Sequence, residues 1–222
     1  MLPLLYLKHK SGSNMKLSTT GFFSLVAVLG TIAAVSSCSK YDRFSGTWQS
    51  TPERLASIPD AADATSTMTI DFAPDVRDTK QGVADFSAVI EITKALPASP
   101  DILDSPYETN ITATASINAR YVFEKGEDDD IILSFDPSTL KVNVDPAGVT
   151  FSENLLSQTE RPVIDSLTTA VAEGWRVAIT AAIREEFMKY KKIEDIKVHH
   201  SDMMSCEVEH RDLTFRRVGV PE

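Results

Sequence analysis

The sequence of 222 residues is short of cysteine and glycine, with only two cysteines, Cys38 and Cys206, and nine glycines. Two distant thiols provide neither a disulfide framework nor a paired C-x₂-C zinc motif. The chain contains no phosphate-binding glycine loop, no G-x-S-x-G and no H-E-x-x-H. We therefore predict no enzyme activity and no cofactor; the alternative is an enzyme whose site is not visible in the sequence.

The chain has fewer basic than acidic side chains. The chain has 22 Lys and Arg residues against 32 Asp and Glu residues, a formal charge of −10. Nucleic acids and anionic membrane surfaces are bound through basic footprints, so the sequence predicts no nucleic-acid partner.

One apolar run, at 21–35, stands out near the start of the chain. It has about fifteen residues, fewer than the roughly twenty that a bilayer span needs. Lys16 precedes it, and small or branched residues lead from it to Cys38. A positive flank, an apolar run and a small-residue cleavage site are typical of a secretory signal peptide. We therefore assign 1–37 to a signal peptide. Because Met15-Lys16 is a natural start for such a segment, we expect Met15 to be the true start.

The cysteine directly after this segment resembles the lipobox of bacterial lipoproteins. The resemblance implies cleavage before Cys38, acylation of its thiol and a lipidated tether at 38–43. Two or three acyl chains anchor a protein stably, whereas one is marginal. By analogy with enterobacterial sorting, Ser39 favours the outer membrane. The mature chain would keep 19 basic and 32 acidic side chains, a formal charge of −13.

The remaining chain predicts one mainly β domain at 44–222. Alternating apolar and polar side chains are typical of half-buried strands. They predict strands at 44–50, 66–72, 86–92, 111–123, 131–135, 140–144, 149–151, 196–201, 204–209 and 213–218. The segment 51–65 is predicted to be a long loop, and 136–138 a turn between two strands.

A different period marks one long helix at about 160–192. Apolar residues recur there at steps of three or four: Ile164, Leu167, Val171, Trp175, Ile179, Ile183 and Phe187. Together with the strands, this helix predicts an antiparallel β-barrel or strongly curled sheet with one long packed α-helix.

A short motif suggests a family. Gly46 and Trp48 resemble the Gly-x-Trp that opens the first strand of lipocalins and related calycins. In that family the tryptophan closes the barrel bottom beneath an arginine from near the chain end. Arg217 is the matching candidate here, and a cation–π contact with Trp48 would satisfy it. The middle loop motif of lipocalins is missing, and more than one strand follows the helix.

A cluster of soft ligands, His200, Met204, Cys206 and His210, raises metal binding as an alternative. On a strand, Met204, Cys206 and His210 would share one face, but that face would serve equally well as core. The cluster also lacks the fixed spacing of true metal sites. We therefore predict no metal site and expect Cys206 to be a buried apolar residue.

The sequence thus predicts a non-enzymatic lipoprotein of the cell envelope, attached to the membrane through Cys38. Its expected ligand is an apolar small molecule or a protein partner. The small alanines on the inner face of 111–123 could make room for a ligand or for the helix. The second arrangement is favoured because the helix must bury its apolar stripe, and it shifts the expected function toward protein binding.

Overall fold

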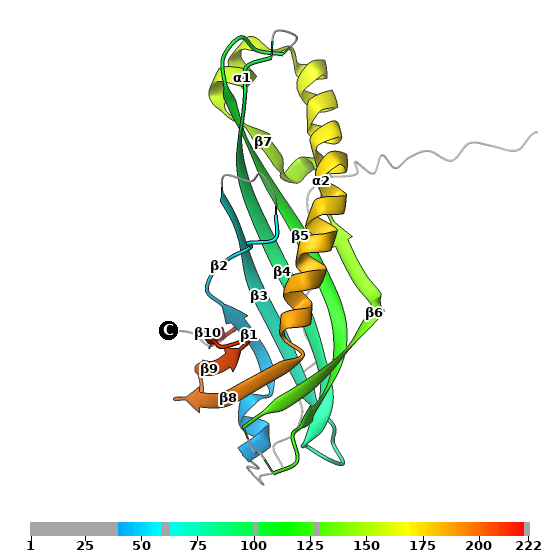
Figure 1. The fold of residues 1–222 in the computed structure, drawn as a ribbon, viewed down its shortest axis with the longest axis vertical. Coiled ribbons are helices and arrows are strands. Elements are labelled where there is room, and N and C mark those ends of the chain that lie inside the picture. The colour runs from blue at the N-terminus through cyan, green and yellow to red at the C-terminus, as the bar shows by residue number, and fades with distance from the viewer. Residues whose placement is uncertain (1–39, 59–62, 100–101, 127–128, 220–222) are drawn as a thin grey trace, which may run out of the picture. The chain divides into compact units, whose positions relative to one another are not determined.

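The structure is a computed structural model that describes residues 40–58, 63–99, 102–126 and 129–219. The predicted signal peptide and Cys38 lie outside these residues. The described chain is mainly β, with one long helix packed against a large antiparallel sheet, as the sequence predicts (Figure 1). The elements in chain order are η1 (Lys40–Phe44), β1 (Gly46–Ser50), β2 (Glu53–Arg54), β3 (Asp63–Pro74), β4 (Gln81–Leu96), β5 (Tyr107–Phe123), β6 (Ile131–Asn143), η2 (Pro146–Gly148), β7 (Val149–Phe151), α1 (Glu153–Gln158), α2 (Arg161–Lys189), β8 (Lys192–His199), β9 (Met203–Val208) and β10 (Arg211–Arg217).

The strands close into an irregular ring. Their order in the sheet is β1-β10-β9-β8-β6-β5-β4-β3-β2, and β1 also pairs with β3. This second pairing joins the two ends of the order, so the ring is barrel-like. It is not a clean barrel, because β7 pairs with one end of β5 while β6 pairs with the rest of that strand.

The inner face of the ring follows from the alternation seen in the sequence. Along β5 nearly every second side chain is buried, from Tyr107 through Ile111 and Ile117 to Tyr121. The β3 and β4 strands show the same pattern and pair in register from Asp63↔Thr93 to Pro74↔Gly82. Because side chains alternate between faces, this pairing places the buried apolar side chains on one side, whereas Val83 and Val89 of β4 are exposed on the other.

The weakest join of the ring lies between β6 and β8. Only Ile131↔Ile193 and Ile132↔Lys192 are paired there. The Lys192 ammonium reinforces the join, lying 2.8 Å from Glu194, 3.0 Å from Glu124 and 3.1 Å from Asp130. Hydrogen bonds to these carboxylates, that of Glu194 foremost, raise the pKa of Lys192, so the cation persists across the physiological range.

The C-terminal half of α2 packs one face against the inner side of the ring, while Arg184 and Glu185 on its other face are exposed. Ile179, Ile183 and Phe187 are fully buried, and the Phe187 ring packs edge-to-face on Phe86 of β4, with centroids 6.2 Å apart. The earlier apolar positions of the helix, such as Leu167, are only partly buried against the core. Among the helices that the structure describes, none combines the length and apolar character needed to span a bilayer.

The predicted turn at 136–138 is wrong, because β6 continues through it. Asp136 accepts hydrogen bonds from the Ser138 hydroxyl at 2.6 Å and amide at 3.0 Å, which lower the pKa of Asp136. These are turn contacts, but the register with β5 shifts between Ser116 and Asn118 and pairing resumes beyond the shift. A β-bulge therefore absorbs Pro137 and the polar residues around it within one strand.

The bounds of several predicted elements also differ from those in the structure. The described part of the predicted tether, with Phe44, forms the 3₁₀ helix η1, so the first strand begins at Gly46. The predicted loop 51–65 contains β2 and the start of β3. The helix ends at Lys189 instead of about 192, because Lys192 already pairs in β8.

Replacing Phe187 with alanine tests the packing of the helix inside the ring. Phe187→Ala should lower the free energy of unfolding by about 3–5 kcal/mol, since it leaves a cavity in a closed core. Val177→Ala, at a side chain 79% exposed on the same helix, should change it by less than about 0.5 kcal/mol. Urea unfolding followed by circular dichroism measures both, and equal effects would contradict the packing.

Candidate functional site

The motif predicted from Gly46, Trp48 and Arg217 comes together at one end of the ring. The Arg217 guanidinium carbon lies 4.2 Å from the centre of the Trp48 ring, so the predicted cation–π contact is present. Trp48 is fully buried, and its indole N–H donates to the Phe44 carbonyl at 2.6 Å. The arginine thus covers the tryptophan and joins β10 to β1.

Arg217 also binds three separate carbonyls. Its Nε donates to Ser201 at 2.6 Å, and its Nη1 and Nη2 donate to Ser45 at 2.6 Å and Arg43 at 2.7 Å. Desolvation lowers the pKa of Arg217, yet the group stays charged because arginine starts far above physiological pH. The contact therefore ties the β8–β9 turn, η1 and β1 together.

Glycine is required at position 46 for two physical reasons. Its φ of +99° is in the region that side chains with a Cβ rarely adopt. A Cβ there would also lie 2.9 Å from Arg217 Nη1. The Gly-x-Trp spacing therefore has a structural role in this chain: it lets the guanidinium approach the backbone.

The ring interior, where an apolar ligand was one expectation, is occupied by side chains. Ala113, Ala115 and Ala119 of β5 are each at most 5% exposed and belong to the same core as Ile183 and Phe187 of α2. The small residues and the helix therefore belong to one continuous core.

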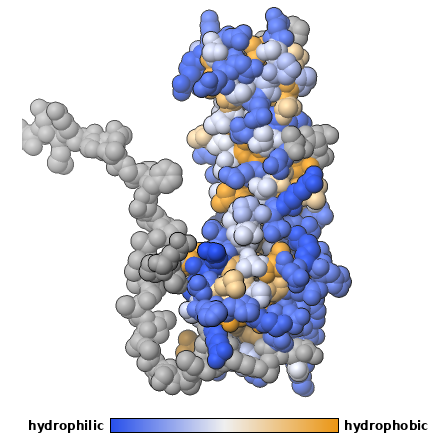
Figure 2. All heavy atoms as spheres, turned by 90° about the vertical axis from the view of Figure 1, so that its left-hand side faces the viewer, coloured by the Kyte–Doolittle hydropathy of each residue, from blue (hydrophilic) through white to orange (hydrophobic). Residues whose placement is uncertain are grey.

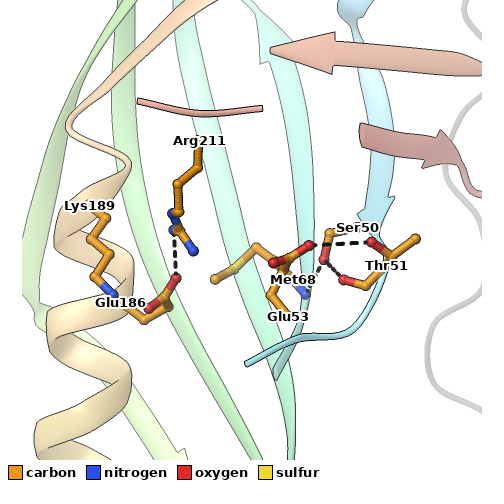
Figure 3. Close-up of polar contacts among 7 residues, drawn as sticks. All are labelled: Ser50, Thr51, Glu53, Met68, Glu186, Lys189 and Arg211. Atoms are coloured by element: carbon orange, nitrogen blue, oxygen red, sulfur yellow. Dashed lines mark hydrogen bonds and ion pairs between the residues drawn. The ribbon is translucent and has the colours of Figure 1, made fainter. Parts of the chain in front are cut away.

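A buried carboxylate fastens the end of α2 to the ring (Figure 3). Glu186 is 3% exposed and accepts from Lys189 Nζ at 2.6 Å and from Arg211 Nη2 at 3.2 Å. Arg211 lies on β10, so the ion pair spans from helix to sheet. Burial, with a smaller effect of the Glu186 charge, raises the pKa of the neighbouring Tyr190 hydroxyl. A carboxylate held by two cations suits a structural link better than proton transfer.

Across the ring in Figure 3, a second set of polar contacts stabilises the first strands. The Ser50 hydroxyl accepts from the Met68 amide at 2.9 Å and donates to the Thr51 carbonyl at 2.8 Å. These bonds satisfy a buried serine at the point where β1 leaves β3. Neither this set nor Glu186 was identified from the sequence.

The residues considered as metal ligands do not converge. Met204 and Cys206 are buried in the core, whereas His200 and His210 are exposed in turns with φ of 53° and 64°. His199 contacts the Ser205 hydroxyl at 3.0 Å. Within the part of the chain that the structure describes, no three His, Cys, Asp or Glu side chains form a group that could hold a metal ion.

An open groove of about 490 Å³ lies at the surface between η2, β7, α1 and the first turns of α2. Its lining is mixed: Val149 and Phe151 are 6% and 7% exposed and Leu156 is 48% exposed, whereas Arg161, Asp165 and three threonines are polar. Figure 2 shows that apolar side chains reach one face of the domain as separate patches in a largely hydrophilic surface. We call the hollow the distal groove, since α1 and η1 lie at opposite ends of the sheet in Figure 1.

Replacing Arg217 tests its contacts with the Trp48 ring and the three carbonyls. Arg217→Ala should lower the free energy of unfolding by about 1–3 kcal/mol, because three carbonyls, one of them part-buried, lose a charged donor and the Trp48 ring loses its cation. Arg217→Lys should recover little of this, since an ammonium lacks the planar fork. Thr214→Ala, at an exposed position of β10, is the control. Urea unfolding measures all three, and full recovery by lysine would contradict the geometry.

The burial of Cys206 predicts a masked thiol. Burial raises the pKa of Cys206 from 9.0 to about 12, so the thiol stays protonated in the folded protein. The unfolded thiol ionises first as pH rises, so the fold should lose stability between about pH 9 and pH 12. In a Cys38→Ser background, a thiol reagent at pH 8 should modify Cys206 only after unfolding. An added Thr214→Cys should react at once, and rapid reaction of Cys206 would contradict its burial.

Comparison with protein-family models, curated proteins and solved structures finds no match for the chain. The lipocalin-like resemblance therefore depends on Gly46, Trp48 and Arg217 and on the mainly β ring that they close.

Proposed function

We propose that the chain is a lipid-anchored protein of the bacterial cell envelope whose lipocalin-like β domain binds a protein partner. The anchor is the acylated thiol of Cys38, and the membrane is the outer membrane. Lys16, the apolar run 21–35 and the small residues before Cys38 support the anchor.

The observation that carries the choice of a protein partner is the filled interior. Fully buried Ile179, Ile183 and Phe187 take the space that an apolar small molecule would need. Close-packed cores hold few voids larger than a water molecule, so such a ligand would have to displace the helix. Binding at the surface needs no such displacement, and the distal groove supplies partly exposed apolar residues.

Metabolic labelling with palmitate tests the anchor. The wild type and Cys206→Ser should both incorporate label, whereas Cys38→Ser should not, because Cys206 is buried and only Cys38 follows the signal peptide. An unlabelled wild type, or a labelled Cys38→Ser, would contradict the lipoprotein proposal.

Native mass spectrometry tests the binding mode. The protein is made in its own host with residues 1–38 replaced by a leader that ordinary signal peptidase removes. Its mass should equal that of the polypeptide, with no small molecule retained. A stoichiometric apolar ligand would contradict surface binding and favour the ring interior.

A further inference from the structure

The end of the domain that holds the distal groove carries charge of one sign. The described residues 102–112 and 143–170 contain six exposed acidic residues: Asp104, Glu108, Asp145, Glu153, Glu160 and Asp165. Their one basic residue is Arg161, which pairs with Asp165 at 3.1 Å. Lys94 of β4 pairs with Thr109, the partner of Phe151, and its ammonium lies over the Trp175 ring at 5.3 Å. These segments therefore carry an excess of carboxylates next to a groove whose own charged lining is the Arg161–Asp165 ion pair.

The same end exposes apolar surface. Leu156 and Val163 are 48% and 42% exposed, and Ile164 lines the groove while only partly buried. Leu156 and Ile164 line the groove next to buried Val149 and Phe151 and give it an apolar part that a partner can cover. Apolar surface next to an excess of carboxylates has the character of a binding site for segments that are both apolar and cationic.

The location of the groove agrees with such a role. Cys38 is two residues before Lys40, where η1 begins. Figure 1 shows η1 and α1 at opposite ends of the sheet. A protein held at the η1 end would therefore present the distal groove to partners away from its anchor.

We propose that the distal groove binds a cationic amphipathic segment of a protein partner. Apolar side chains of that segment cover Phe151 and Leu156, and its Lys or Arg side chains face Glu153 and Glu160. A second copy of the chain would bring the same acidic face and be repelled, and so would nucleic acid or an anionic membrane. This inference rests on the proposed function and names the chemistry of the partner.

A synthetic amphipathic peptide of Lys and Leu serves as the probe, with a Glu and Leu peptide of equal length for comparison. Fluorescence anisotropy measures peptide binding to the full chain in neutral detergent micelles. The Lys peptide should bind, several-fold more weakly as salt is raised. Leu156→Ser should weaken binding by about tenfold, the size expected for an anchoring contact. Glu153→Gln with Glu160→Gln should weaken it and reduce its dependence on salt.

Two control variants keep the test specific. Val177→Ser, exposed on α2 and not part of the groove lining, and Glu91→Gln, exposed on β4, should bind the peptide as the wild type does. Binding of the Glu peptide, absence of binding, or equal loss in Leu156→Ser and Val177→Ser would overturn the proposal. Palmitate labelling and native mass spectrometry test the proposed function independently. If the protein is labelled and ligand-free but the groove variants bind the peptide as the wild type does, only the proposal for the distal groove is refuted.

Discussion

The packing of one face of the C-terminal half of α2 against the inner side of the strand ring is the constraint on which the other features depend. The ring has small inner side chains on β5 and a two-pair join between β6 and β8, so strand pairing alone would leave it hollow and weakly closed. Phe187 and Ile183 fill it, and Glu186 fastens the helix to Arg211 of β10. Removing either cation would leave a buried carboxylate short of a partner, which is costly in an apolar core.

The opposite end of the ring is closed by one arginine. Arg217 stacks on Trp48 and gives a hydrogen bond to each of three carbonyls. Because those carbonyls come from η1, the residue before β1 and the β8–β9 turn, one guanidinium holds segments that are distant in sequence. With one end closed and the interior occupied, the surface that remains for a ligand is outside the ring, and the distal groove offers an apolar part of it.

Much of the fold could be predicted because alternation and helical periodicity are local. The 111–123 alternation extends outward to give β5, and the Ile164–Phe187 stripe gives α2. The contact between Trp48 and Arg217 could be predicted because Gly46 and Trp48 resemble a motif whose tryptophan packs under an arginine from near the chain end. The turn predicted at 136–138 is wrong because a β-bulge forms the same side-chain hydrogen bonds as a turn. The burial of Glu186 could not be predicted from the sequence, because only the closed ring brings Arg211 next to it. The distal groove could not be predicted either, because four separate elements form it.

Native-state hydrogen exchange of the α2 amides tests the central claim most directly. If the helix is a permanent part of the core, the amides of Ile179, Ile183 and Phe187 should exchange only with global unfolding, at the same free energy as the central amides of β4 and β5. The amides near Leu167 should exchange at lower free energy, since that half of α2 is only partly buried. Exchange of the Ile183 and Phe187 amides well below the global free energy would show that the helix leaves the ring in the native state, and would contradict the account.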